Sequence, residues 1–274
     1  MARTSFRGTA VSARKSVSRL NMRGRRSVAK QIVARARRRA VDVPERQGVT
    51  VVTVTWNSMP FLKAFLQGVR TFGGDDVEIL VVDNNSDDGT AEFLAAQPDV
   101  TTVTLPFNFG HGLGLDTAFI NARTTHVIAL DVDAFPISKG WLSTVIEPLA
   151  QGAVVAGAYV QRAFIHPSYL AMRRKDFLDM KLSFVPIGVR TQSGEAPQGL
   201  FLDVGEALCQ TVAVARGSVT LHRVPITSTR GDGMVGSVYG DVVYHNFYST
   251  QGNPNLVEQA RLVWASAVTE YLPA

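Results

Sequence analysis

Four short runs rich in Val, Ile, Leu and Thr alternate with helix-like segments in the first half of the chain, and this alternation constrains the fold more than any other feature. The runs cover residues 49–55, 77–82, 101–105 and 127–130. Such runs are typical of strands, and the continuous apolar run at residues 127–130 is typical of a strand that is buried on both faces, as in a parallel sheet. Repeated strand–helix units form a doubly wound sheet through right-handed crossovers. The sequence therefore predicts an α/β fold with a mostly parallel sheet flanked by helices.

The second half of the chain continues this alternation less regularly. A long loop is expected over residues 182–202, and a Gly-rich, mobile link over residues 227–236. Loops as long as the first often cover an active site. Further helices are predicted at residues 139–149, from about 203 to 215, and 255–271, and further strands at 154–160 and 218–224.

Two carboxylates follow the fourth apolar run. Asp131 and Asp133 are separated by one residue, and both face the same side if the chain stays extended as far as Asp133. Ligands of open α/β sheets bind at the carboxyl ends of the strands. Paired carboxylates there suit Mg²⁺ or Mn²⁺ carrying a diphosphate. Taken alone, this short pattern is explained more simply by solvated acids at a strand end.

Charge divides the chain into a basic arm and an acidic body. Residues 1–48 hold 14 Lys and Arg against 2 Asp and Glu, a balance of +12, whereas residues 49–274 hold 14 against 21, a balance of −7; together these give the net charge of +5. Within the arm, residues 27–40 are predicted to form a basic helix, because small apolar residues recur there at four-residue spacing. The helix is only weakly amphipathic.

Four interpretations of the arm remain open. It is a solvated flexible segment, a cationic anchor for an anionic membrane surface, a mitochondrial or plastid transit peptide, or a nucleic-acid-binding segment. Each Lys or Arg near an anionic leaflet contributes roughly 1 kcal/mol, although the apolar face is small and lacks Trp or Phe. Few acids and many Arg and Ser are compatible with a transit peptide, whereas nucleic acid is the weakest fit because no aromatic residue follows Phe6 in the arm. We expect a cytoplasmic protein, free or peripheral at the inner face of a membrane, with organellar targeting left open.

Cysteine content and hydropathy exclude several classes of protein. The single Cys209 rules out an internal disulfide framework, and its apolar surroundings favour packing over nucleophilic chemistry. No apolar run approaches the roughly 20 residues that span a bilayer. Gly110, Gly112 and Gly114 precede a predicted helix and suit an anion. Their spacing is neither G-x-G-x-x-G nor that of a P-loop, so neither a Rossmann dinucleotide site nor a P-loop is indicated.

Four motifs, in order, resemble those of the family 2 glycosyltransferases, which have the GT-A fold. They are TVTWNS at 53–58, ILVVDNNSDDGT at 79–90, NFGHG at 108–112 and DVD at 131–133. Each motif is weak alone, but the ordered set is specific, and the second motif is the most specific of the four. The resemblance covers roughly residues 49–145. It implies that this half binds a nucleotide sugar and that residues 146–274 form the acceptor side.

The resemblance implies a role for each strand end. Asp83, which closes the second strand, is expected to hold the donor base, and Thr55 and Asn57 to line the nucleotide pocket. Of the paired acids, Asp131 is expected to orient the ribose and Asp133 to bind the Mn or Mg that carries the diphosphate. The other residues expected to bind the nucleotide sugar are Asn85 and Gly110.

The resemblance also points to three residues farther along the chain. The family's catalytic base is an acid in a Glu-Asp pair ahead of a helix; here Leu202 replaces the first acid, so Asp203 is the better match and Glu206 the alternative. His245 is expected to complete the metal shell, as a C-terminal histidine does in some GT-A enzymes, and a structural histidine packed among aromatic rings is an equal alternative. Asp116 stands where the family more often has Asn, so its role is open.

One strand end in the second half also resembles the family. The acceptor-side strand of family members commonly ends in Arg, which makes Arg173 or Arg174 a candidate to face the diphosphate. A solvated basic turn explains these two residues equally well. His166, near the start of the same segment, is interpreted as structural.

Together these features predict an inverting, metal-dependent glycosyltransferase. It would move a sugar from a nucleotide-diphosphate sugar to a hydroxyl of a glycan, a lipid-linked or a small-molecule acceptor; inversion is implied by the resemblance alone. One alternative is a catalytically degenerate GT-A domain that acts as a binding or scaffold subunit. A second is a sugar-phosphate nucleotidyltransferase, which needs a Gly-rich, Arg-bearing loop that residues 56–60 do not provide.

Overall fold

The computed structural model describes residues 22–160, 164–187, 202–231, 235–247 and 254–273. Residues 1–21 of the arm and most of the expected loop over 182–202 lie outside the described residues.

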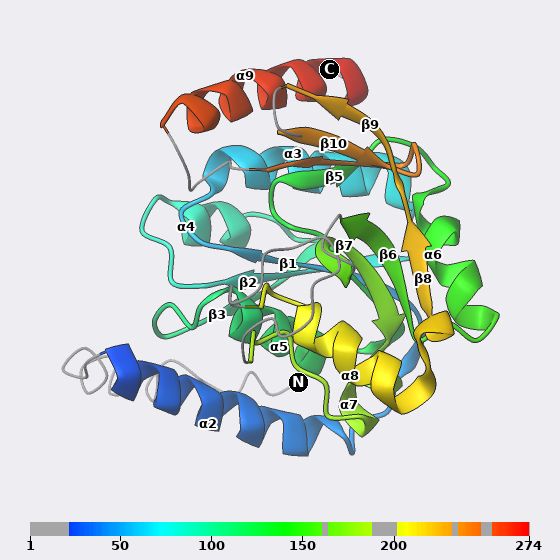
Figure 1. The fold of residues 1–274 in the computed structure, drawn as a ribbon. Helices are drawn as coiled ribbons and strands as arrows, with labels where there is room; N and C mark the ends of the chain where they lie inside the picture. Colours follow the sequence, from blue (N-terminus) through cyan, green and yellow to red (C-terminus); the bar gives the residue numbers. More distant parts are fainter. Residues whose placement is uncertain (1–21, 161–163, 188–201, 232–234, 248–253, 274) are drawn as a thin grey trace.

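A mixed sheet occupies the centre of the molecule (Figure 1). In the described part of the chain it has seven strands in the order β3-β2-β1-β4-β7-β6-β8. The four strands from β3 to β4 are parallel. β7 runs antiparallel to β4 and β6, and β8 is parallel to β6. The strands are β1 (Arg46–Thr55), β2 (Val77–Asp83), β3 (Val100–Thr104), β4 (Thr124–Ala129), β6 (Val155–Val160), β7 (Phe164–Arg173) and β8 (Leu221–Val224).

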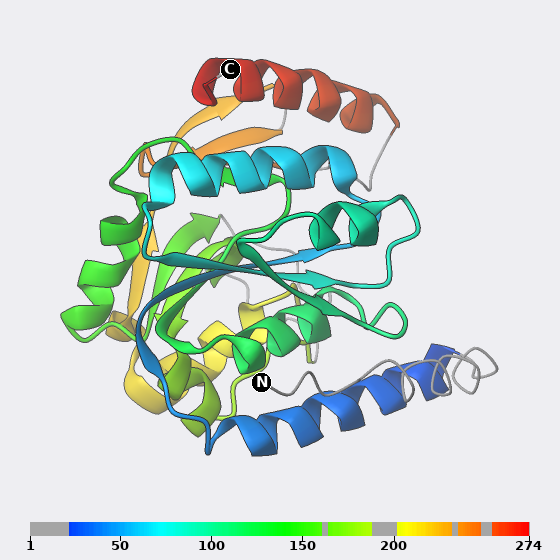
Figure 2. The same ribbon diagram turned by 180° about the vertical axis from the view of Figure 1, so that it is seen from behind.

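Helices cover both faces of the sheet (Figures 1 and 2), which confirms the predicted α/β architecture. β1 has valines on both of its faces because both faces are buried. Val52 and Val54 enter one hydrophobic cluster, and Val51 enters the other. One face carries α3 (Met59–Gly73), α4 (Thr90–Ala95) and α6 (Trp141–Ala150), and the opposite face carries α2 (Met22–Ala40), α5 (His111–Asn121), α7 (Arg174–Asp179) and α8 (Glu206–Arg216).

A second, antiparallel sheet stands beside the first. Its order is β5-β11-β10-β9, and the C-terminal helix α9 (Pro254–Tyr271) packs against it through Trp264 and Ala267. The sequence did not predict this sheet, and the expectation of a mobile link is wrong for the residues that form β9. The strands are β5 (Ala134–Pro136), β9 (Ile226–Arg230), β10 (Gly236–Tyr239) and β11 (Val243–Asn246).

The basic helix α2 is part of the folded body. Its residues Ala29, Val33 and Ala40 are buried in the same cluster as α5. The Arg37 guanidinium donates to the carbonyl oxygens of Phe177 at 3.1 Å and Leu182 at 2.5 Å. The solvated-arm interpretation therefore does not describe residues 22–40. None of the described helices has the length and apolar character needed to cross a membrane.

Arg173 and Arg174 lie away from the paired carboxylates. Because β7 is antiparallel to β4, Arg173 pairs with His126 near the start of β4, whereas Asp131 follows the other end of that strand. Arg174 is 1% exposed, and its guanidinium donates to the Ala40 carbonyl at 3.0 Å. The expectation that either arginine faces the diphosphate is therefore wrong.

The packing of α2 predicts a difference between neighbouring positions. Val33 is 5% exposed and Ile32 is 41% exposed. Val33→Asp should lower the free energy of unfolding by roughly 3 kcal/mol, because it buries an unpartnered charge. Ile32→Asp, the matched control, should change it by less than about 0.5 kcal/mol. Urea denaturation of both variants measures the difference, and equal values would mean that α2 does not contribute to the core.

Candidate active site

A cavity of about 400 Å³ opens beyond the carboxyl ends of β1, β2 and β4. This is the edge at which the sequence placed the candidate residues. Four of the candidate residues, Asp131, Asp133, Gly110 and Asp203, line the cavity. The other lining residues come from the same strand ends and loops: Val54, Trp56, Ser58, Phe61, Asn84, Asn108, His111, Val132, His166 and Val204.

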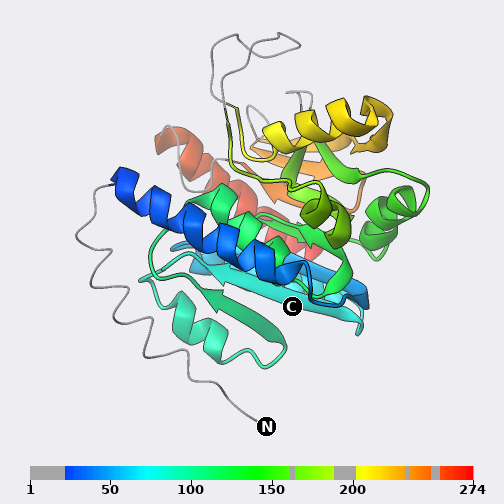
Figure 3. The same cartoon turned by 90° about the horizontal axis from the view of Figure 1, so that it is seen from below.

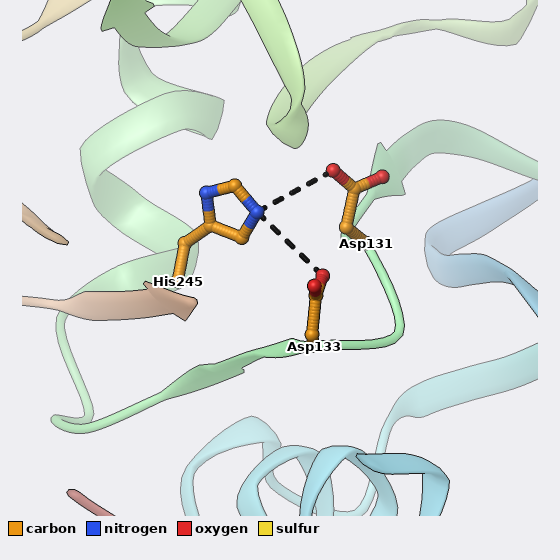
Figure 4. A group of neighbouring side chains, drawn as sticks. All are labelled: Asp131, Asp133 and His245. Carbon is orange, nitrogen blue, oxygen red and sulfur yellow. Dashed lines mark ion pairs between the residues drawn. The ribbon is translucent and has the colours of Figure 1, made fainter. Parts of the chain in front are cut away.

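The paired carboxylates reach the cavity through a turn and not through an extended strand. β4 ends at Ala129, and the Ala134 N–H donates to the Asp131 carbonyl at 2.9 Å, which closes a turn over the pair. β5 starts directly after Asp133 and pairs antiparallel with β11, so that Ala134 lies opposite His245. The chain does not stay extended as far as Asp133, but the turn still directs both side chains to one place (Figure 4).

Asp131, Asp133 and His245 form a group that fits a divalent metal. One ligand atom from each of the three lies within 4.8 Å of the others. His245 Nε2 is 3.6 Å from Asp131 Oδ2 and 3.6 Å from Asp133 Oδ1 (Figure 4). The other ring nitrogen, Nδ1, is 3.3 Å from the Tyr239 hydroxyl. Such a second partner fixes the ring with Nε2 toward the carboxylates, as around metal-binding histidines generally. Two carboxylates and an imidazole suit Mn²⁺.

Two more histidines, His111 and His166, lie beside Asp131. They were not predicted from the sequence as site residues. His111 Nε2 lies 3.1 Å from Asp131 Oδ1, and His166 Nδ1 lies 3.7 Å from Asp131 Oδ2. Burial lowers the pKa of His111, but the charges of Asp131, Asp133 and Asp203 outweigh this, so its pKa is raised. Burial lowers the pKa of His166. For Asp131, the three histidines outweigh the effect of burial, and its pKa is held below the usual range.

His111 and His166 differ in how far their positions could be predicted from the sequence. His111 belongs to the NFGHG motif and begins α5 directly after Gly110, so its place beside an anion site was predictable. His166 lies at the start of β7, at the same edge as the end of β4 only because these strands are antiparallel. Its Nδ1 accepts a hydrogen bond from the Ser168 N–H at 3.1 Å. No local pattern in the sequence indicated that direction of pairing.

Asp83 and Thr55 lie beneath the cavity wall. Asp83 is 1% exposed, and its Oδ1 accepts a hydrogen bond from the Ser86 N–H at 3.0 Å. Its Oδ2 and the Thr55 hydroxyl are buried without a hydrogen-bond partner among the described residues. Neither residue lines the cavity itself, although Asn84, which follows Asp83, does. A buried carboxylate oxygen without a donor is costly unless a ligand supplies one.

Asn57 and Asn85 shape the turns at the same edge. Both have a positive φ, 50° and 66° respectively, a conformation that Asn tolerates better than most residues. The Asn57 N–H donates to Ser86 Oγ at 3.0 Å, and the Asn57 side-chain oxygen accepts from the Asp87 N–H at 2.9 Å. These bonds tie the end of β1 to the turn after β2.

Asn84 and Asn108 hold the Gly-rich loop. Asn84 Oδ1 accepts a hydrogen bond from the Phe109 N–H at 2.7 Å, and Asn84 Nδ2 donates to Asn108 Oδ1 at 3.1 Å. Asn108 Oδ1 also accepts from the Gly110 N–H at 2.7 Å. Gly110 has a φ of 80°, which a residue with a side chain rarely adopts. The loop is thereby fixed as a wall of the cavity.

Asp203 and Glu206 have separate places. Asp203 lines the cavity, and its Oδ1 accepts a hydrogen bond from the Val204 N–H at 2.8 Å. Glu206 is 5% exposed, and its Oε2 accepts from the Asp203 N–H at 3.0 Å. This bond joins the first residue of α8 to the backbone of the loop that precedes the helix. The cavity therefore receives the Asp203 carboxylate, while Glu206 stabilises the helix start behind it.

More than half of the chain matches the model of a known protein family. The model of the family described as glycosyl transferase family 2 matches residues 50–194, more than half of the chain. The chain belongs to glycosyl transferase family 2. A search of curated proteins found no match.

One solved structure shows the same fold class, and two others are similar over part of the chain. A mannosyltransferase from Pyrobaculum calidifontis, in complex with GDP-Man and Mn²⁺, has 20% sequence identity and a TM-score of 0.51, over 82% of this chain and 68% of that one. Glucosyl-3-phosphoglycerate synthase from Mycobacterium tuberculosis, with Mn²⁺ and UDP-glucose, has 14% identity and a TM-score of 0.49, over 88% and 84%. TarS of S. aureus has 18% identity and a TM-score of 0.43, over 51% of this chain. The match covers 50% of the TarS chain, so this chain spans about half the length of that protein.

Asp116, which departs from the family pattern, has a structural role behind the cavity. Its Oδ1 accepts a hydrogen bond from the Phe184 N–H at 2.8 Å, and its Oδ2 lies 2.6 Å from the Ser183 hydroxyl. Burial raises the pKa of Asp116 to about 6, and the hydrogen bonds and the charge of Arg37 oppose this rise. The residue ties α5 to the segment that follows α7.

The raised pKa of Asp116 predicts a specific dependence of stability on pH. The folded chain holds this proton more tightly than the unfolded chain does, so the free energy of unfolding should fall as pH rises from about 4 to about 6, by roughly 2–3 kcal/mol. Asp116→Asn, which keeps an acceptor for Phe184, should remove this contribution and be the more stable form near pH 7.5. Urea denaturation at several pH values measures it. An unchanged slope in the variant would contradict the assignment.

Proposed function

We infer that this glycosyltransferase is metal-dependent and inverting, and that it transfers a sugar from a nucleotide diphosphate to an acceptor hydroxyl. One observation carries the proposal. The candidate metal group of Asp131, Asp133 and His245 meets one cavity wall, and the Asp203 carboxylate reaches the same cavity from the start of α8. A charge-stabilising group on the leaving side and a base on the acceptor side are the two elements that such a transfer needs.

The proposed donor site uses the ends of β1 and β2. The Asp83 Oδ2, buried without a donor among the described residues, is suited to accept a hydrogen bond from the N–H of a nucleobase. Thr55, Asn57 and Asn85 shape this edge, and Trp56, 50% exposed, offers a ring face beside the cavity. Gly110, at the start of α5, presents backbone to the phosphates, because a helix N-terminus favours an anion.

In the proposed metal site, Asp133 and His245 hold Mn²⁺ or Mg²⁺, and Asp131 lies beside them toward the ribose. When bound, such an ion neutralises the charge that develops on the leaving diphosphate. Tyr239 keeps the His245 ring in place through its contact with Nδ1. His111 Nε2 lies 3.1 Å from Asp131 Oδ1 on the other side of that carboxylate. The mannosyltransferase that shares the fold binds GDP-Man and Mn²⁺, which supports a nucleotide sugar and a manganese ion here.

Asp203 is the proposed general base. Its carboxylate takes the proton of the acceptor hydroxyl while the hydroxyl oxygen forms a bond to the anomeric carbon of the donor sugar. The bond from that carbon to the diphosphate oxygen breaks on the opposite face, which inverts the configuration. Glu206 is poorly placed for this role, because it is buried and already accepts the Asp203 N–H.

A thermal-shift screen tests the donor and the metal together. UDP-, GDP- and dTDP-sugars are added to the protein with Mn²⁺, with Mg²⁺ or with EDTA, and a bound donor should raise the melting temperature. Asp133→Ala should remove the part of the shift that depends on metal and lower transfer by at least about 100-fold, because the leaving diphosphate loses its counter-charge. Full donor turnover in Asp133→Ala would contradict the metal site.

Replacing each of the two acids near α8 identifies the base. Asp203→Asn keeps an acceptor for the Val204 N–H and removes the base, so kcat should fall by about 10²–10⁴-fold while donor binding is retained. In Glu206→Gln the side-chain oxygen can still accept the Asp203 N–H, so kcat should change by only a few-fold. Transfer of radiolabelled sugar measures both variants. A larger loss in Glu206→Gln would move the base to Glu206, and loss in neither would overturn the proposed mechanism.

A further inference from the structure

A second groove, with no part in the proposed chemistry, lies between α2 and the segment after α7. Its volume is about 420 Å³. Lys30, Arg37, Arg38 and Lys181 line it together with apolar side chains, and Asp116 is its acidic lining residue. Two of the apolar residues, Val41 and Ile187, are 57% and 68% exposed. Cations and accessible apolar side chains are therefore interleaved at one place on the surface.

The outward side of α2 extends this basic surface. Arg26, Lys30, Arg35, Arg38 and Arg39 are exposed, and no ion pair is recorded between these five and any carboxylate of the described residues. Figure 3 shows α2 running across the underside of the molecule, in front of α5. These charges belong to the +12 arm of a chain whose remainder carries −7. A surface of this sign attracts a polyanion.

The apolar side of α2 is not free to enter a membrane, because it is already packed on α5. The exposed side of α2 remains accessible to a membrane. We propose that the exposed side of α2 and the adjoining groove form a docking surface for an anionic phospholipid bilayer. The cations contact lipid phosphates and carboxylates, and Val41 and Ile187 reach the apolar boundary below the headgroups.

The chemistry of the surface favours a bilayer over a nucleic acid. Neither α2 nor the lining of the groove contains an aromatic ring among the described residues. Binding of single-stranded nucleic acid depends strongly on stacking of bases on such rings. Exposed Val41 and Ile187 would gain nothing from a phosphate backbone, whereas an interface between headgroups and acyl chains accommodates charge and apolar surface together.

The docking surface is adjacent to the active-site cavity. His111, at the start of α5, lines the cavity, while Leu113 and Asp116 of the same helix line the groove. The space between them is tightly filled, since a Cβ added to Gly112 would lie 2.9 Å from the Phe184 carbonyl oxygen. If the proposed transferase activity holds, a bilayer on this surface would bring lipid-borne acceptors close to Asp203. The docking itself does not depend on that activity.

Co-sedimentation of the full chain with vesicles tests the surface. Vesicles of phosphatidylcholine with 30% phosphatidylglycerol are compared with vesicles of phosphatidylcholine alone, over a range of salt. The triple variant Lys30→Glu, Arg38→Glu and Lys181→Glu should lose at least about 100-fold in partitioning to anionic vesicles, since each cation contributes roughly fivefold. The matched control, Lys139→Glu, Arg216→Glu and Arg261→Glu, makes the same change of net charge at exposed positions elsewhere and should lose far less.

A second pair of variants tests the apolar contribution. Ile187→Ser should weaken the binding that persists at 0.5 M salt by several-fold, because screening leaves the apolar contacts. Val214→Ser replaces a residue that is 90% exposed on α8 and should leave this binding unchanged. Equal losses in the two triple variants, or retained binding in the triple variant of α2 and the groove, would overturn the proposal. A loss of oligonucleotide binding with vesicle binding intact would assign the surface to nucleic acid instead.

Failure of this proposal and failure of the proposed function remain distinguishable. Vesicle binding is measured without donor or acceptor, and transfer to a water-soluble acceptor is measured without vesicles. The triple variant should keep its melting temperature and its donor-induced thermal shift, because none of its three positions lines the catalytic cavity. A variant that binds neither vesicles nor donor would indicate a folding defect and would remove support for a specific docking surface.

Discussion

The pairing of β5 with β11 is the contact on which the candidate site depends. β5 begins one residue after Asp133 and has only three residues, yet it places Ala134 opposite His245. The Asn246 N–H donates to the Asp133 carbonyl at 2.9 Å and closes the same junction. Through this short pairing, a histidine more than 100 residues away faces two carboxylates at the end of β4. The second sheet thus serves the chemistry by fixing where the chain goes after the paired acids.

A second set of contacts joins the basic helix to the segment that leads to the proposed base. Arg37 of α2 donates to the Leu182 carbonyl, and Asp116 of α5 accepts from the Phe184 N–H. The Phe184 carbonyl then accepts from the Gly205 N–H at 3.3 Å, next to Asp203 and the start of α8. The described part of the arm is therefore joined to the folded body by hydrogen bonds as well as by apolar packing. The outside of α2, where we propose that a bilayer docks, is connected to the Asp203 side of the cavity through these hydrogen bonds.

The first half of the fold was predictable because its signals are local. Apolar runs ending in Asp83 and Asp131 indicated parallel strands with polar ends, and positions 84–90 showed dense turn residues, so the edge that holds the cavity followed from strand order alone. The second half was less predictable. The antiparallel direction of β7 places His166 next to Asp131 and Arg173 far from it. The sequence of β7 alone does not indicate which strand it pairs with. Short strands such as β9 carry too few residues to show a periodic pattern.

By itself, the sequence determined the chemical character of this protein: carboxylates at strand ends, glycines before a helix, and a basic arm ahead of an acidic body. These properties depend on residue type and on spacing within a few positions. The tertiary structure decided which of these groups act together. It placed Asp203 at the cavity and Glu206 against the Asp203 backbone, brought two histidines to Asp131, and buried the apolar side of α2. Such choices depend on contacts between distant segments, whose geometry is set by packing of the whole core.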